Sequence, residues 1–320
     1  MNNLLKLVQE QIKTVIIGKD EQIAKVLMAI LAKGHILLED VPGVGKTTMA
    51  IAFAKALGLD TKRVQFTPDT MPSDIIGFSI YNKNTGKLEY QEGTIMTNLV
   101  LADEINRTSS KTQSALLEAM EEKNVTVDGV TYELPFPFIV LATQNPVGSA
   151  GTQMLPNSQL DRFLIKMSMG YPGLSEQANI LQGKHKENPM EKVQEVITRD
   201  ELASLIDQTN AVYIKDELFM YISKLVQATR DNENVELGVS PRGALALCNM
   251  AKAHAFVLGR DYVIPEDVQE VFMDVCAHRL LLSSRAKLND YTPEKILPEI
   301  LESVEMPVID DIRDAKKRAI

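Results

Sequence analysis

The sequence is poor in the residues that form disulfides and metal centres. It contains two cysteines and four histidines among 320 residues. Cys248 and Cys276 lie in apolar, helix-like stretches and form no Cys-x-x-Cys pair, so we expect two reduced thiols in the core. The histidines are scattered, without the spacing of zinc ligands. The pattern argues against a structural disulfide and against a resident zinc site.

Long apolar runs and an excess of positive charge are also missing. No stretch of about 18 apolar residues and no basic, hydrophobic leader is found, so neither a membrane span nor a secretory signal is indicated, and we expect a cytoplasmic protein. The 34 basic and 43 acidic residues give a net charge of −9. Proteins that grip nucleic-acid phosphates usually carry a basic stripe or excess, so nucleic acid is not the expected partner.

The chain is long enough for two compact domains, and one glycine-rich loop stands out in it. The apolar residues 35–38 read as a strand, and they lead into Glu39–Thr48 with the sequence EDVPGVGKTT. Glycines in such a loop let backbone N–H groups point at a triphosphate, while lysine adds a charge and threonine a hydroxyl for Mg²⁺. We therefore predict a site for ATP and Mg²⁺, with these loop residues binding the nucleotide: Pro42, Gly43, Val44, Gly45, Lys46, Thr47 and Thr48.

The loop departs from the usual phosphate-loop pattern at one position. The pattern G-x-x-x-x-G-K-[ST] requires glycine at position 40, where this chain has Asp40. Pro42 and the two glycines still supply a tight turn. We expect the departure to affect nucleotide affinity and loop geometry, and not the class of site.

Two further apolar strands end in polar side chains. Residues 99–102 lead into Asp103 and Glu104, and residues 138–143 lead into Gln144 and Asn145. The spacing suits a phosphate-loop ATPase, in which Asp103 holds Mg²⁺ together with Thr47 and Glu104 polarises the attacking water. Asn145 is expected between the other two strand ends, where its amide can position the γ-phosphate and the water.

These motifs together resemble the AAA+ ATPases and, within them, the MoxR family. The resemblance is carried by LLEDVPGVGKT at 37–47, ADEINR at 102–107, KTQSALLEAM at 111–120, ATQNP at 142–146 and QLDRF at 159–163, and it covers nearly the whole chain. It implies a P-loop α/β core followed by a helical lid. It also implies that Ile17 and Gly18, ahead of the loop, cup the adenine.

The resemblance assigns roles to arginines as well. Arg162 is implied to be an arginine finger that reaches the γ-phosphate bound by a neighbouring subunit, and Arg242, in SPRG at 240–243, resembles the sensor-2 arginine placed over the phosphates of its own subunit. Arg107 is a third candidate for contact with a neighbour. Arginine suits these roles because its planar fork stays charged and grips two phosphate oxygens. The sequence leaves open which arginine acts between subunits.

Two predicted hairpins support the same family. Residues 77–90 alternate around Asn84-Thr85-Gly86, and residues 125–132 alternate around Asp128-Gly129. The first resembles a helix-2 insert and the second a pre-sensor-1 insert. In relatives with both inserts the hairpins face a central pore, whereas the simpler alternative is that they only extend the sheet surface.

The expected organisation is a nucleotide-binding domain over 1–170 and a helical lid over 171–320. Pro172 and Gly173 interrupt the pattern after the last predicted strand. Beyond them, a capping box at Thr198–Glu201, a cap at Ser240 and Pro265 each predict the start of a helix.

Several functional interpretations remain. The favoured one is a MoxR-type motor in which a ring, expected to contain six subunits, couples ATP hydrolysis to the remodelling or maturation of a partner, such as a protein with a von Willebrand A domain. The alternatives are a DNA-associated motor like the minichromosome-maintenance helicases, a magnesium-chelatase-like motor subunit, and a nucleotide-gated scaffold without catalysis. The net negative charge disfavours the DNA motor.

Overall fold

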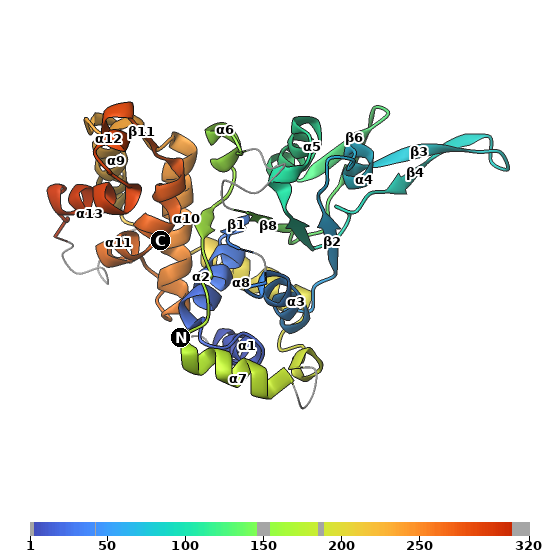
Figure 1. Cartoon of the computed structure of the whole chain (residues 1–320), viewed down its shortest axis with the longest axis horizontal. Coiled ribbons are helices and arrows are strands. Elements are labelled where there is room, and N and C mark those ends of the chain that lie inside the picture. Colours follow the sequence, from blue (N-terminus) through green and yellow to red (C-terminus); the bar gives the residue numbers. More distant parts are fainter. Residues whose placement is uncertain (1–2, 42, 146–153, 185–188, 309–320) are drawn as a thin grey trace.

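Strands and helices alternate through the first half of the chain, and helices dominate the second half (Figure 1). The computed structural model describes residues 3–41, 43–145, 154–184 and 189–308. The strands are β1 Ile36–Glu39, β2 Thr61–Gln65, β3 Gly77–Asn82, β4 Lys87–Glu92, β5 Leu99–Asp103, β6 Asn124–Val127, β7 Val130–Glu133, β8 Ile139–Gln144, β9 Ile165–Met167, β10 Val235–Leu237 and β11 Leu281–Leu282. The α-helices are α1 Asn3–Lys13, α2 Asp20–Leu31, α3 Lys46–Ala56, α4 Pro72–Ile76, α5 Ser110–Glu122, α6 Asn157–Leu160, α7 Leu174–Lys184, α8 Arg199–Asn210, α9 Asp216–Asp231, α10 Pro241–Val257, α11 Pro265–Cys276, α12 Ser284–Leu288 and α13 Pro293–Ser303. The 3₁₀ turns are η1 Ile105–Arg107, η2 Pro189–Lys192 and η3 Ala277–Arg279.

The central sheet is parallel, as the sequence predicts. Its strand order is β2-β5-β8-β1-β9. Strand β8 lies between β5 and β1, so three segments with predicted site residues meet at the same edge of the sheet: Asp103 and Glu104 at the end of β5, Asn145 after β8 and the phosphate loop after β1. The carboxyl edge of a parallel sheet is where ligands bind in open α/β folds.

Both faces of this sheet are buried. Within β5, Leu99 and Leu101 join one hydrophobic cluster, and Val100 and Ala102 join the other. This two-sided burial explains the continuous apolar sequence of the strand. The first cluster continues from the N-terminal helices through the C-terminal helices as far as Ile300. The core and the C-terminal helices therefore share packing, and the boundary at 170/171 stays a prediction.

The two predicted hairpins are confirmed, and each forms a separate two-stranded sheet. Strands β3 and β4 extend away from the body of the molecule (Figure 1). Strands β6 and β7 join through Asp128 and Gly129, both with positive φ, as a tight hairpin turn requires. The rings of Tyr90 in β4 and Tyr132 in β7 stack with centroids 4.0 Å apart. The hydroxyl of Tyr90 also donates to the carbonyl of Ile76, 2.6 Å away.

The predicted caps of the C-terminal helices are also confirmed. Thr198 and Glu201 form the capping box of α8, the Ser240 hydroxyl accepts from the N–H of Gly243 at the start of α10, and Pro265 opens α11. Both cysteines are free thiols on these helices, and burial raises the pKa of Cys276 to about 12. Among the described helices, none combines the length and apolarity needed to cross a bilayer.

A buried histidine fixes the start of β1 against the sheet. The Nδ1 atom of His35 accepts the N–H of Val140, 3.0 Å away, and its Nε2 donates to the carbonyl of Met120, 3.1 Å away. Burial lowers the pKa of His35 to about 4. The ring is therefore neutral at neutral pH and serves the fold.

Candidate active site

The phosphate loop turns through two glycines in the left-handed region. Gly43 has a φ of 89° and Gly45 a φ of 96°, and α3 begins at the next residue, Lys46. Residues other than glycine rarely adopt such backbone angles, so the two glycines shape the loop. The N-terminus of α3 then presents unpaired backbone N–H groups, which is the usual cradle for a phosphate. Pro42 was also predicted to bind nucleotide, but it lies outside the described residues.

Lys46 is buried beneath the loop. Its Nζ donates to the carbonyl of Asp40 at 2.8 Å and to that of Val41 at 3.4 Å. Burial lowers the pKa of Lys46, and the negative charges of Asp40, Asp103 and Glu104 oppose that shift. The ammonium group is thus close enough to the acidic pair to feel its charge. Its two partners are backbone carbonyls of the same loop.

A cavity of about 510 Å³ opens beside the loop. Its size falls in the range of small-molecule sites. Four segments of the chain form its walls: the N-terminal stretch, the phosphate loop with the first turn of α3, the stretch after β9 with α7, and η2. The lining residues are Val15, Ile16, Ile17, Lys19, Gly43, Val44, Gly45, Thr48, Met169, Tyr171, Pro172, Gln177, Ile180, Leu181 and Met190.

Most of the predicted nucleotide-binding residues therefore meet at one cavity. Ile17 lies in its wall, and the neighbouring Gly18, with a φ of 70°, packs so tightly that an added Cβ would lie 1.9 Å from Oε1 of Glu176. Thr47 is the second residue of α3, next to Thr48 of the cavity wall. The largely aliphatic walls suit a flat base, and the loop at one end suits phosphates.

The acidic pair at the end of β5 is held by neighbouring strands. The Asp103 carboxylate accepts from Nε of Arg63 at 2.6 Å and from the Thr143 hydroxyl at 3.2 Å. The backbone N–H of Glu104 donates to the same hydroxyl at 2.9 Å. Glu104 has a φ of 57°, a conformation that costs a glutamate roughly 1 to 3 kcal/mol and often marks a functional site.

Three side chains hold the Glu104 carboxylate. Nη1 of Arg107 donates to Oε2 at 2.6 Å, Nε2 of Gln65 donates to Oε2 at 3.0 Å, and Nδ2 of Asn145 donates to Oε1 at 3.1 Å. The hydrogen bond from Arg107, followed by that from Asn145, lowers the pKa of Glu104 and keeps it ionised. The predicted meeting of Asn145 with the acidic pair is thus observed, and Arg107 pairs with the glutamate of its own chain.

Arg63 and Gln65 are contacts that the sequence did not reveal. Both lie on β2, which pairs with β5 in a register that sets Gln65 opposite Asp103. Their side chains also contact each other, since Nη2 of Arg63 donates to Oε1 of Gln65 at 3.3 Å. Only the strand order brings them to the acidic pair.

Arg162 and Arg242 meet elsewhere. Each donates to a different oxygen of the Glu121 carboxylate near the end of α5, and Nη1 of Arg162 also donates to the carbonyl of Leu117 at 3.0 Å. Neither arginine lines the 510 Å³ cavity. The start of α10 packs toward α5, and the expected place of Arg242 over the phosphates of its own subunit stays a prediction.

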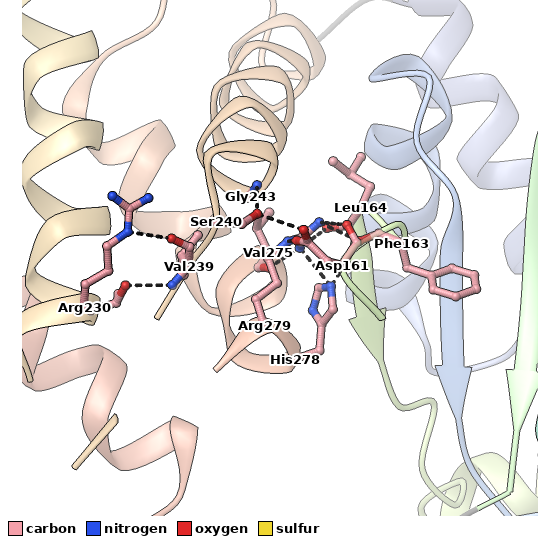
Figure 2. A network of polar contacts seen from close by, with 11 residues as sticks. Asp161, Phe163, Leu164, Arg230, Val239, Ser240, Gly243, Val275, His278 and Arg279 are labelled. Atoms are coloured by element: carbon pink, nitrogen blue, oxygen red, sulfur yellow. Dashed lines mark hydrogen bonds and ion pairs between the residues drawn. The ribbon is translucent and has the colours of Figure 1, made fainter. Parts of the chain in front are cut away.

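A buried polar network fixes the backbone that carries both arginines (Figure 2). Asp161, next to Arg162, accepts from Nε of Arg279 at 2.8 Å and from the hydroxyl of Ser240 at 2.8 Å. The Arg279 side chain is 2% exposed, and its Nη2 donates to the carbonyl of Phe163 at 2.7 Å. Because Ser240 caps the helix that begins with Pro241 and Arg242, the network sets the two arginines side by side.

Comparison with known proteins identifies the class. The family model described as "ATPase family associated with various cellular activities (AAA)" matches residues 35–165, and an AAA lid domain model matches residues 227–300. The crystal structure of a protein from Cytophaga hutchinsonii, named a "putative ATPase", superposes with a TM-score of 0.89 at 39% identity, covering 96% of each chain. Fold and site together define an AAA-type ATPase with a helical lid.

Full-length relatives narrow the class to one family. "Chaperone MoxR1" of Mycobacterium tuberculosis is 39% identical over 311 residues, covering 94% of this chain and 82% of that protein. "Uncharacterized protein YeaC" of Bacillus subtilis is 50% identical over 308 residues, covering 96% of each chain. The chain belongs to the MoxR family of AAA+ ATPases.

Proposed function

We propose that this protein binds ATP with Mg²⁺ in the cavity beside the phosphate loop and hydrolyses it at an interface between subunits of a ring. The observation that carries the proposal is that two groups of side chains have different partners. Lys46, Asp103, Glu104 and Asn145 converge at the carboxyl edge of the sheet, whereas Arg162 and Arg242 converge on Glu121. A site divided in this way is completed by a second copy of the chain.

The residues at the sheet edge fit phosphoryl transfer to water. Lys46 and the amides at the start of α3 would hold the phosphates. The Asp103 carboxylate and the Thr47 hydroxyl are the hard oxygen ligands that Mg²⁺ prefers, and bound Mg²⁺ would neutralise phosphate charge. Glu104, kept ionised by its neighbours, accepts the proton of the attacking water, and Asn145 orients it.

The two arginines fit the remaining task. Each uses a single guanidinium nitrogen for Glu121, Nη1 in Arg162 and Nη2 in Arg242. Within the described part of the chain the other nitrogens of both forks have no recorded partner, so they can bind phosphate oxygens of an adjoining subunit. An arginine supplied in this manner typically accelerates phosphoryl transfer by roughly 10³-fold or more. We infer that both arginines act on the same neighbouring γ-phosphate.

We further propose that the ring is hexameric and cytoplasmic and that it remodels a partner protein, such as one carrying a von Willebrand A domain. The name "Chaperone MoxR1" of a relative supports a chaperone-like role. The protruding β3–β4 hairpin exposes apolar side chains, among them Phe78, Ile80 and Leu88, as a surface that contacts protein would. In this proposal residues 1–170 bind the nucleotide and residues 171–320 form the lid.

The experiment is a mixing test of ATPase activity. Glu104→Gln and Arg162→Ala are each expected to be inactive alone, and a mixture should recover activity where Arg162 of one subunit meets Glu104 of another. The matched control mixes Glu104→Gln with Lys46→Ala, which both damage the pocket and should not rescue each other. The ATPase rate per mole of parent protein should also rise with protein concentration, because assembly completes the site. A rate per mole of protein that does not depend on concentration, together with no recovery in the first mixture, would refute the shared site.

A further inference from the structure

Asp40, the residue at the departure from the phosphate-loop pattern, has a specific set of partners. It is 6% exposed. Its carboxylate accepts from the hydroxyl of Ser168 at 2.9 Å, from the N–H of Met169, and from the N–H of Gly170 at 3.3 Å. All three donors are neutral and belong to consecutive residues directly after β9. A glycine at position 40 would supply none of these contacts.

These contacts begin where the pairing of two strands stops. Strands β1 and β9 pair from Ile36 opposite Ile165 to Leu38 opposite Met167. Beyond that point the Asp40 side chain takes the N–H groups of the neighbouring segment. The backbone of Asp40 is engaged as well, since its N–H donates to the carbonyl of Gln144 at 3.2 Å and its carbonyl accepts from Lys46 at 2.8 Å. One residue thus joins β8, the loop lysine and the segment 168–170.

The segment held by Asp40 leads into a wall of the cavity. Met169, which is buried, and Tyr171 and Pro172 line that wall, and α7 continues it with Gln177, Ile180 and Leu181. Between them, Gly170 has a φ of 61°, so the chain changes direction at the residue whose N–H the carboxylate holds. The position of Asp40 therefore determines how the chain leaves the sheet toward α7.

We propose that Asp40 is a positioning residue that couples the phosphate loop to the cavity wall formed by residues 169–181, so that phosphate binding in the loop orders this wall around the rest of the nucleotide. This inference rests on the proposed nucleotide site and adds to it a route from phosphate to lid. The route runs from Lys46 through the Asp40 carbonyl and carboxylate to the backbone of residues 169 and 170.

The charge of Asp40 and its hydrogen bonds predict opposite effects of a neutral substitution on nucleotide affinity. A carboxylate near the loop repels a bound polyphosphate, so charge alone predicts that neutral substitutions bind nucleotide more tightly. Coupling through hydrogen bonds predicts the opposite, because the freed N–H groups no longer hold the wall. The two ideas also differ in rank order: charge treats Asp40→Asn and Asp40→Gly alike, whereas coupling places Asn between Asp and Gly, since its amide oxygen still accepts.

The first test is the affinity for ADP, measured by calorimetry on the full chain. Loss of a hydrogen bond to a charged group corresponds to about a tenfold change in affinity, so we expect Kd to rise at least about tenfold in Asp40→Gly and less in Asp40→Asn. Asp74→Asn is the matched control, because that carboxylate caps α4 away from the cavity, and it should bind ADP like the parent. Equal or tighter binding by Asp40→Gly would overturn the proposal.

A second test separates coupling from stability. Hydrogen exchange of the amides in 169–181 should slow when ADP saturates the parent, and saturating ADP should slow it less in Asp40→Asn and in Ser168→Ala, a variant that removes a single donor. If Asp40→Gly does not fold, these two variants decide the matter. Parent-like protection in both would overturn the inference while leaving the nucleotide site in place. A parent chain that binds no ADP would instead refute the proposed function itself.

Discussion

Replacing Asp161 with asparagine should weaken the joint between the sheet and the C-terminal helices. The change keeps the shape of the side chain and leaves an oxygen that can accept from Ser240, but it removes the charge that faces Arg279. The Arg279 side chain is 2% exposed and that of Asp161 is 18% exposed, so water compensates the lost charge poorly. The network in Figure 2 would then hold an arginine without its carboxylate.

The expected magnitude follows from burial and from the contacts that remain. Removing one partner of a buried ion pair costs roughly 3 to 5 kcal/mol. Arg279 keeps hydrogen bonds to the carbonyls of Phe163 and Leu164, which places this case at the lower end, near 3 kcal/mol. With an unfolding entropy of about 2.1 cal/mol/K per residue, a chain of 320 residues should lose about 4 °C in Tm.

Thermal unfolding followed by circular dichroism measures this shift, and ATPase activity measures its consequence. Activity should fall as well, because the network supports the backbone beside Arg162. The matched control is Glu10→Gln, which removes an exposed pair with Lys13 at 3.6 Å and should change Tm by less than about 1 °C. If Asp161→Asn unfolds within about 1 °C of the parent, the buried pair does not hold the two parts together as argued.

Two further predictions concern Glu121 and His35. In Glu121→Gln the two arginines lose the negative charge between them, so we expect kcat of the ATPase to fall roughly tenfold with ADP affinity unchanged. The control is Glu118→Gln, on the exposed face of α5, which should behave like the parent. An unchanged kcat in both variants would contradict the argument. Burial lowers the pKa of His35 from 6.5 to about 4, so the unfolded chain binds the proton more readily than the folded one. The neutral ring therefore contributes about 3 kcal/mol to the free energy of unfolding above pH 6.5, and this contribution is lost as the pH falls toward 4. Urea unfolding across this range should show a shallower pH dependence in His35→Gln, and equal slopes would refute a buried neutral histidine.

The sheet edge was predictable because each of its residues follows a strand with a clear signature. Lys46 follows a glycine pair, and Glu104 and Asn145 each come directly after a strand so apolar that burial on both faces was the natural expectation. Parallel strands bring such ends together whatever the loops between them do. The meeting of Asn145 with Glu104 therefore needed the fold class alone.

The contacts that escaped prediction depend on packing between distant elements. Gln65 reaches Glu104 because β2 is the neighbour of β5, an order that no local pattern encodes. Arg242 reaches Glu121 because the start of α10 is fastened to the turn after α6 through Asp161. Asp40 was recognised as a departure from a motif, but its partners lie 128 to 130 residues further along the chain.

The stacked rings of Tyr90 and Tyr132 join the two hairpins to each other. A force on the tip of the longer hairpin would reach the shorter hairpin through this contact, because stacked aromatic rings attract each other. Strand β8 follows the shorter hairpin in the chain, and Asn145, directly after β8, donates to Glu104. A ligand that displaces the tip of the longer hairpin would therefore also displace the stretch of chain that brings Asn145 to Glu104.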